Sequence, residues 1–200
     1  MKKTLISTAL VAVLGLAGLA PMAASAADGT ITFNGEVTDT TCTITGGGAA
    51  TGSGNITVTL PTVSASALAS NGQTAGDTNF SLILGGGTNC ADGKTAALWI
   101  ETSQTPALDV ATGALKNQAA SGAGNVEVRM VNPANSQPIN LGINAQVTSG
   151  ETVIAANNQP AAEISGNTAT LNYIAQYLAN GGSATPGAVT TYLTYSMQYN

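Results

Sequence analysis

The residue types that carry most enzyme chemistry are sparse in this chain. Its 200 residues include no histidine, ten carboxylates and two cysteines. Without histidine, catalytic triads with a histidine base and histidine metal sites lack their central residue. The carboxylates are scattered singly, so solvated strand faces account for them better than a catalytic acid and base facing each other across a cleft. We therefore expect a protein that is not an enzyme and that uses no metal or cofactor.

The start of the chain predicts export. Lys2 and Lys3 precede an apolar run from Leu5 to Ala20, which is followed by the small-residue site Ala24-Ser25-Ala26. This order is typical of a cleaved secretory signal, which we assign to residues 1–26. Cleavage leaves 174 of the 200 residues, enough for one ordinary domain with a core.

The exported chain keeps two cysteines, Cys42 and Cys90. An even number of cysteines in an oxidising compartment favours a disulfide over two free thiols. We expect this bond to contribute to the stability of the domain.

Charge excludes two classes of partner. Charged residues make up 8% of the chain, compared with about 25% in a typical soluble protein. After residue 26 only Lys94, Lys116 and Arg129 are basic, against ten carboxylates. Nucleic acid and anionic membrane surfaces are therefore excluded as partners. No later segment approaches the roughly 20 apolar residues of a membrane span, so the mature chain is not expected to be membrane-embedded.

Alternation with a period of two predicts an all-β domain. In the segment 126–131, Val126, Val128 and Met130 share one face, and Glu127 and Arg129 lie on the other. This pattern predicts a half-buried strand. The run Ala96–Ile100 is apolar on both faces and predicts a central strand. Gly, Asn, Ser and Pro clusters such as Gly46–Gly48 and 180–183 predict turns between strands, and many short strands of this kind indicate a sandwich. Further candidate strands are Asn55–Leu60, Asn79–Leu84, Leu171–Leu178 and Val189–Tyr199.

The two ends of the mature chain each show a clear alternation of side chains between two faces of a strand. Near the N-terminus, one face of residues 30–37 carries Ile31, Phe33, Gly35 and Val37. At the C-terminus, one face carries Val189, Thr191, Leu193, Tyr195, Met197 and Tyr199, and the sequence ends at Asn200. Periodicity alone predicts ordinary sandwich strands at both ends.

These features together resemble one family. Phe33-Asn34-Gly35 a few residues before Cys42, and the block Ala184–Ala188 leading into an alternating strand with penultimate Tyr199, are similar to the chaperone–usher fimbrial subunits of the type 1 fimbrial (pilin) family. The resemblance covers essentially the whole mature chain. It implies an incomplete immunoglobulin-like β-sandwich that lacks its last strand and is completed by a donor strand from a neighbouring subunit.

The resemblance also implies roles for residues. Residues 27–41 would be the N-terminal extension, with Ile31, Phe33, Gly35 and Val37 as the donor face, and residues 42–200 the pilin domain. A groove beside the C-terminal strand, from Gly187 to Asn200, would accept first a strand of a periplasmic chaperone and then the donor strand. Basic chaperone residues would anchor the Asn200 carboxylate. Passage through an outer-membrane usher would place a homopolymer of pilins in an extracellular fimbrium that supports adhesion, with this chain as its major subunit.

Other interpretations remain open at this point. Gly35 can sit where the groove leaves no space for a side chain, or mark a β-bulge. Gly187 can be the glycine that precedes the final strand in the family, or part of an ordinary turn after Pro186. The chain could instead be a minor tip or adaptor subunit, or a secreted carbohydrate-binding sandwich that stacks a sugar on Trp99, Tyr173 or Tyr177. Trp99 follows both cysteines, which argues against an antibody-like domain.

Overall fold

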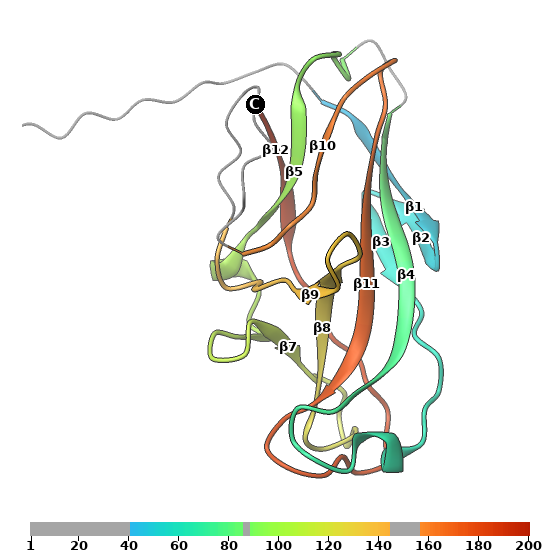
Figure 1. The fold of residues 1–200 in the computed structure, drawn as a ribbon, viewed down its shortest axis with the longest axis vertical. Coiled ribbons are helices and arrows are strands. Elements are labelled where there is room, and N and C mark those ends of the chain that lie inside the picture. Colours follow the sequence, from blue (N-terminus) through green and yellow to red (C-terminus); the bar gives the residue numbers. More distant parts are fainter. Residues whose placement is uncertain (1–40, 86–88, 145–156) are drawn as a thin grey trace, which may run out of the picture. The chain divides into compact units, whose positions relative to one another are not determined.

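The computed structural model describes residues 41–85, 89–144 and 157–200, and over these residues the chain is built almost entirely of strands (Figure 1). Helix is limited to two short 3-10 turns, as expected. In chain order the elements are β1 (Thr43–Gly48), β2 (Ala50–Ser53), β3 (Asn55–Val58), η1 (Ala65–Leu68), β4 (Thr74–Gly85), β5 (Thr95–Ile100), η2 (Thr102–Gln104), β6 (Leu108–Asp109), β7 (Ala114–Lys116), β8 (Val126–Asn132), β9 (Gln137–Pro138), β10 (Ala161–Glu163), β11 (Ala169–Ala179) and β12 (Tyr195–Tyr199).

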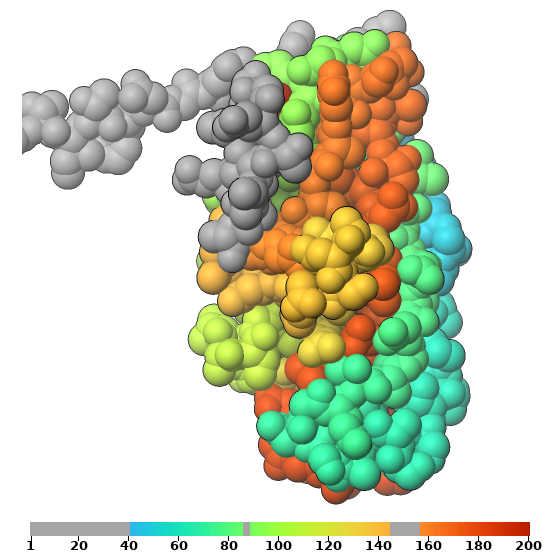
Figure 2. Space-filling model, in the orientation of Figure 1, coloured from blue at the N-terminus to red at the C-terminus, as the bar shows by residue number. Residues whose placement is uncertain are grey.

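Two antiparallel sheets share one core. The larger sheet has the order β3-β2-β1-β4-β11-β8-β7-β6, with β9 beside β8, and the smaller has the order β10-β5-β12. Leu98 and Ile100 of the smaller sheet pack with Leu82 and Leu171 of the larger one in a single buried cluster. The predicted all-β sandwich is therefore confirmed. Figure 2 shows one face of it, with the β8–β9 hairpin in yellow at the surface.

The longest strands, β4 and β11, form the centre of the larger sheet. Phe80, Leu82 and Leu84 alternate toward the core as predicted, and Tyr173 pairs with Phe80 across the two strands. The Phe80 and Tyr173 rings stack with centroids 5.3 Å apart. Tyr173 is only 1% exposed, and burial raises the pKa of its hydroxyl. This tyrosine is a core residue and offers no surface on which a sugar could stack.

Strand β5 is the central strand of the smaller sheet, as its doubly apolar sequence predicts. It pairs with β10 on one side and β12 on the other. Ala96, Ala97 and Leu98 are all buried, so both faces of the strand are covered. Neither helical turn in the described part of the chain has the length and apolar character needed to cross a membrane.

The prediction that β8 is half-buried was wrong. Glu127, expected on a solvated face, is only 4% exposed. Its carboxylate accepts hydrogen bonds from the Thr112 hydroxyl (2.7 Å) and the Asn180 amide (2.8 Å). Arg129 donates to Gln176 (3.2 Å), and partial burial lowers the pKa of its guanidinium. The alternating sequence could not show that the β6–β7 hairpin and the chain after β11 cover this second face.

Three boundaries also differ from prediction. Gly46–Gly48, expected as a turn, belongs to β1 and pairs with Leu82–Phe80 of β4. Glycine is needed there because a Cβ on Gly46 would lie 2.7 Å from the backbone of Ala50 in the next strand. The strand expected to end at Leu60 ends at Val58, and the strand expected from Val189 begins only at Tyr195. Both shortened strands border the groove described next.

Candidate functional site

A groove of about 640 Å³ opens between the two sheets. One wall is Ile56–Leu60, which comprises most of β3 and the two residues after it, and the other is Val189–Tyr195, which leads into β12. Core side chains from both sheets form the floor. The floor residues are Phe80, Leu82, Leu98, Leu115, Val128, Met130, Ala175 and Tyr177.

Both walls turn alternate side chains toward the groove. On the first wall Ile56, Val58 and Leu60 are half-buried, whereas Thr57 and Thr59 are exposed. On the second wall Val189, Thr191, Leu193 and Tyr195 are half-buried, and Thr190 and Tyr192 are exposed; Thr194, where the chain joins β12, is half-buried as well. The inward side chains are thus strand-like in spacing but only partly covered.

The walls are also unpaired strand edges. Among the described strands, β3 pairs only with β2, and β12 pairs only with β5. Within the part of the chain that the structure describes, residues 189–194 have no sheet partner, which is why the predicted strand Val189–Tyr199 is shortened to β12. An apolar floor between two unpaired edges has the shape of a sandwich from which one strand is absent, and such edges readily pair with another chain. Among the described residues that line the groove, none is acidic or basic, so the groove is suited to apolar contacts and backbone pairing.

Beyond Tyr195, the C-terminal strand is tied to the start of the domain. The Tyr195 hydroxyl donates to the carbonyl of Gly54 (2.6 Å), and the Cys42 N–H donates to the Tyr199 hydroxyl (3.3 Å). Burial raises the pKa of the Tyr195 hydroxyl. The last residue, Asn200, exchanges two backbone hydrogen bonds with Thr95. The chain end is therefore fixed against both β1 and β5.

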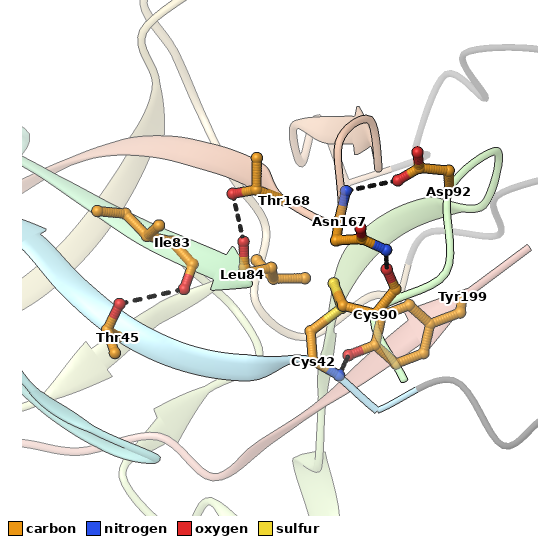
Figure 3. The surroundings of a disulfide bond; sticks show 9 residues. All are labelled: Cys42, Thr45, Ile83, Leu84, Cys90, Asp92, Asn167, Thr168 and Tyr199. Carbon is orange, nitrogen blue, oxygen red and sulfur yellow. Dashed lines mark hydrogen bonds between the residues drawn. A yellow bond between two sulfur atoms is a disulfide. The ribbon is translucent and has the colours of Figure 1, made fainter. Parts of the chain in front are cut away.

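The predicted disulfide between Cys42 and Cys90 is present (Figure 3), with the Cα atoms 4.5 Å apart. It joins the residue before β1 to the segment before β5. The Asn167 side chain donates to the Cys90 carbonyl (2.8 Å), and the Thr41 N–H donates to the Asn89 carbonyl (2.8 Å). The bond and its neighbours hold the beginning of the domain beside the end of β12.

Replacing both cysteines by serine is expected to lower the free energy of unfolding by about 4 kcal/mol, because the bond closes a loop of 48 residues that would otherwise be free in the unfolded chain. Urea unfolding of the mature chain with and without the double substitution measures this difference. Chemical reduction of the unaltered chain is the matched control and should give the same loss. A loss below about 1 kcal/mol would contradict a stabilising role.

Only some of the C-terminal residues that were predicted for the groove lie in its lining. Val189, Thr191, Leu193 and Tyr195 line it, whereas Met197 and Tyr199 of β12, and Asn200 after that strand, lie outside its lining. The predicted donor residues, Ile31, Phe33, Gly35 and Val37, lie outside the described residues, as do the predicted signal and residues 27–40 of the extension.

Gly187 precedes the groove wall and is required by a close backbone approach. A Cβ at this position would lie 2.4 Å from the Ala123 nitrogen and 2.6 Å from the Gly122 carbonyl carbon. The backbone bends at Pro186 and Gly187, and the Gly187 φ is outside the left-handed region, so the close approach, rather than an unusual backbone conformation, requires glycine here. Any side chain here would push the wall away from the β7–β8 loop.

Sequence reasoning missed the first wall. Asn55–Leu60 was recognised as a candidate strand, and its alternation already pointed to Ile56, Val58 and Leu60 as one face. Nothing in the pattern showed that this strand would be the outer edge of the sheet and would face the C-terminal segment. That placement depends on the β1–β2–β3 meander, which is built from glycine-rich sequence that resembled a loop.

Comparison with known proteins supports the assignment of the domain. Residues 60–200 match the family model described as type-1 fimbrial protein, A. The chain belongs to the type-1 fimbrial protein family. It is 41% identical over 186 residues to the major fimbrial subunit SMF-1 of Stenotrophomonas maltophilia, covering 90% of this chain and 98% of that relative. It is 40% identical over 190 residues to the F17 fimbrial protein of Escherichia coli, covering 94% and 96%.

Other relatives of this fimbrial subunit include the minor subunit HifD of Haemophilus influenzae, 37% identical over 92% of this chain and 80% of that relative. Among solved structures, the P pilus rod subunit PapA is 16% identical with a TM-score of 0.45, covering 86% of this chain and all of that one. Family membership makes this protein a structural subunit of a surface pilus, and it confirms the resemblance seen in the sequence.

Proposed function

We propose that this fimbrial subunit polymerises by donor-strand exchange, in which its groove receives residues 27–41 of a neighbouring copy. The observation that carries the proposal is the apolar groove bounded by two unpaired edges, Ile56–Leu60 and Val189–Tyr195. A strand added there would form backbone hydrogen bonds with the edges and place alternate side chains over the floor. It would complete the core that the subunit alone leaves open.

The N-terminal extension has the pattern that such a groove requires. Ile31–Val37 matches the wall Val189–Tyr195 in number of residues and presents Ile31, Phe33, Gly35 and Val37 on one face. Burying the three apolar side chains contributes roughly 5 to 9 kcal/mol before the cost of ordering the strand. Gly35 supplies a position where the incoming backbone can approach the floor closely.

The same groove dictates a route of assembly. An uncovered apolar groove with unpaired edges is prone to aggregation, so after signal cleavage a periplasmic chaperone covers it until an outer-membrane usher delivers the neighbouring subunit. Each subunit has one groove and one extension, so the contact is heterologous and generates a head-to-tail filament. In this scheme the chain is the major, homopolymeric subunit of an extracellular shaft that supports adhesion.

Peptide capture tests the proposal. The acceptor is the mature chain, residues 27–200, with its own Ile31, Phe33 and Val37 changed to Ser so that it cannot donate. We expect a fluorescent peptide of residues 27–41 to form a one-to-one complex with this acceptor that survives gel filtration. The matched control is the same peptide with Ser at the three apolar positions, and equal retention of both peptides, or of neither, would contradict strand exchange.

A further inference from the structure

The backbone of the second wall is hydrogen-bonded to the rest of the domain along the edge that faces away from the groove. In an extended chain, neighbouring residues direct their backbone N–H and C=O groups to opposite edges. Three even-numbered residues of this segment are bonded to the domain: Ala188 and Thr190 to the loop between β7 and β8, and Thr194 to Glu101 and Thr105. The fourth, Tyr192, makes no backbone hydrogen bond within the described residues. Within the described residues, the backbone groups of Val189, Thr191 and Leu193 form no hydrogen bond. The odd-numbered groups therefore face the groove, free to pair.

A single side chain provides much of this anchor. The Asn117 amide nitrogen donates to the Ala188 carbonyl (2.9 Å), and its oxygen accepts from the Thr190 N–H (2.9 Å). Its carboxamide thus presents one donor and one acceptor to the wall, as a peptide group of a neighbouring strand would. The other bonds of the same amide, to the Ala123 carbonyl (2.9 Å) and from the Ala119 N–H (3.0 Å), fix Asn117 within its own loop.

Backbone contacts reinforce this anchor. The Gln118 N–H donates to the Thr190 carbonyl (2.7 Å), and the Ala123 N–H donates to the Ala188 carbonyl (2.9 Å). A Cβ at Gly122 would lie 2.5 Å from the Ala188 carbonyl oxygen, so the loop and the wall can approach this closely only with glycine. The loop between β7 and β8 therefore substitutes for a ladder partner along the back of the wall.

We propose that Asn117 is a positioning residue for strand uptake: it holds the Ala188–Thr190 end of the wall extended, so that Val189 and Thr191 meet the incoming strand with their backbone groups already aligned. The inference rests on the proposed strand exchange and adds a residue that governs its rate. Without the anchor, the wall must be ordered while the strand enters, and association that requires such ordering is slower.

The substitution Asn117→Asp tests this with nearly unchanged shape. A carboxylate places an oxygen, in place of the donating nitrogen, against the carbonyls of Ala188 and Ala123. This repulsion moves the side chain away from the wall, so its bond from the Thr190 N–H is lost as well. The assay is stopped-flow uptake of the fluorescent 27–41 peptide by the acceptor chain with Ser at its own donor positions. We expect N117D to take up the peptide roughly tenfold more slowly, and to lose protection of the Thr190 amide against hydrogen exchange in the peptide-free acceptor.

Asn132→Ala is the matched control. Asn132 is another asparagine whose amide bonds backbone groups, donating to the Asn158 carbonyl (3.0 Å) and accepting from the Ala134 N–H (3.0 Å), but it ends β8 and lies outside the groove lining. It should lower the melting temperature without slowing uptake. Equal uptake rates for N117D and the unaltered acceptor, unchanged Thr190 exchange in N117D, or equal slowing by N132A would overturn the role of Asn117. An unaltered acceptor that takes up no peptide would overturn strand exchange itself, and the inference with it.

Discussion

Chains that carry Val58→Asp are expected to fold and to remain unpolymerised. Val58 is the last residue of β3, half-buried on the groove wall, and its side chain packs against the core only from one side. In the isolated subunit an aspartate there can still reach water through the open groove. Once a donor strand covers the groove, the carboxylate would be buried without a cationic partner, since none lines the groove. That burial costs several kcal/mol, and we expect polymerisation to fall roughly 100-fold or more.

The neighbouring residue provides the control for this substitution. Thr57 precedes Val58 on the same edge strand but is exposed on the opposite face. Thr57→Asp adds the same charge to the same wall on its exposed face, where the carboxylate stays in water when a donor strand covers the floor, and it should polymerise as the unaltered chain does. Circular dichroism of both variants checks that they fold, and gel filtration with electron microscopy follows assembly. Fibres of normal length from V58D, or equal loss from T57D, would contradict a role for the groove in assembly.

The groove also explains why an alternating sequence at the C-terminus does not form one long strand. Residues 189–194 have the alternation of a strand. The backbone groups of Thr190 and Thr194 are satisfied by the Asn117 and Thr105 side chains and by the N–H groups of Gln118 and Glu101. A ladder needs a partner strand on at least one side, and within the described residues none reaches this part of the wall. The sequence therefore encodes a strand that the isolated subunit only partly forms.

The local pattern of residue types was sufficient to predict the structure where a strand packs directly on the core. The burial of Phe80, Leu82 and Leu84, the central place of β5 and the pairing of Cys42 with Cys90 all follow from residue type and spacing. Pattern was insufficient where tertiary neighbours decide the outcome. Glu127 is buried because Thr112 and Asn180, both distant in sequence, close over it.

The anchor at Asn117 could not be predicted either. An asparagine followed by polar and small residues suggests a turn, and that is how its bond to the Ala119 N–H acts locally. Its bonds to Ala188 and Thr190 cross more than 70 positions of sequence separation. Only the folded domain shows that the same amide holds the wall of the groove.

A strand supplied in the same chain should complete the domain. Appending a second copy of Asp28–Asp39 after Asn200, through a flexible linker long enough to return along Val189–Tyr195, makes the groove and its donor intramolecular. The gross contribution of three buried apolar side chains, less the smaller ordering cost of a tethered strand, is expected to raise the melting temperature by roughly 10 to 20 °C. The matched chain has Ile31, Phe33 and Val37 changed to Ser in the appended copy only.

Thermal unfolding of these two chains and the unextended mature chain, with the disulfide intact, is the measurement to make. Strand complementation predicts a large rise in melting temperature for the first chain, loss of that rise in the Ser-substituted chain, and aggregation or polymerisation of the unextended one. Three stable monomers with the same melting temperature would contradict it.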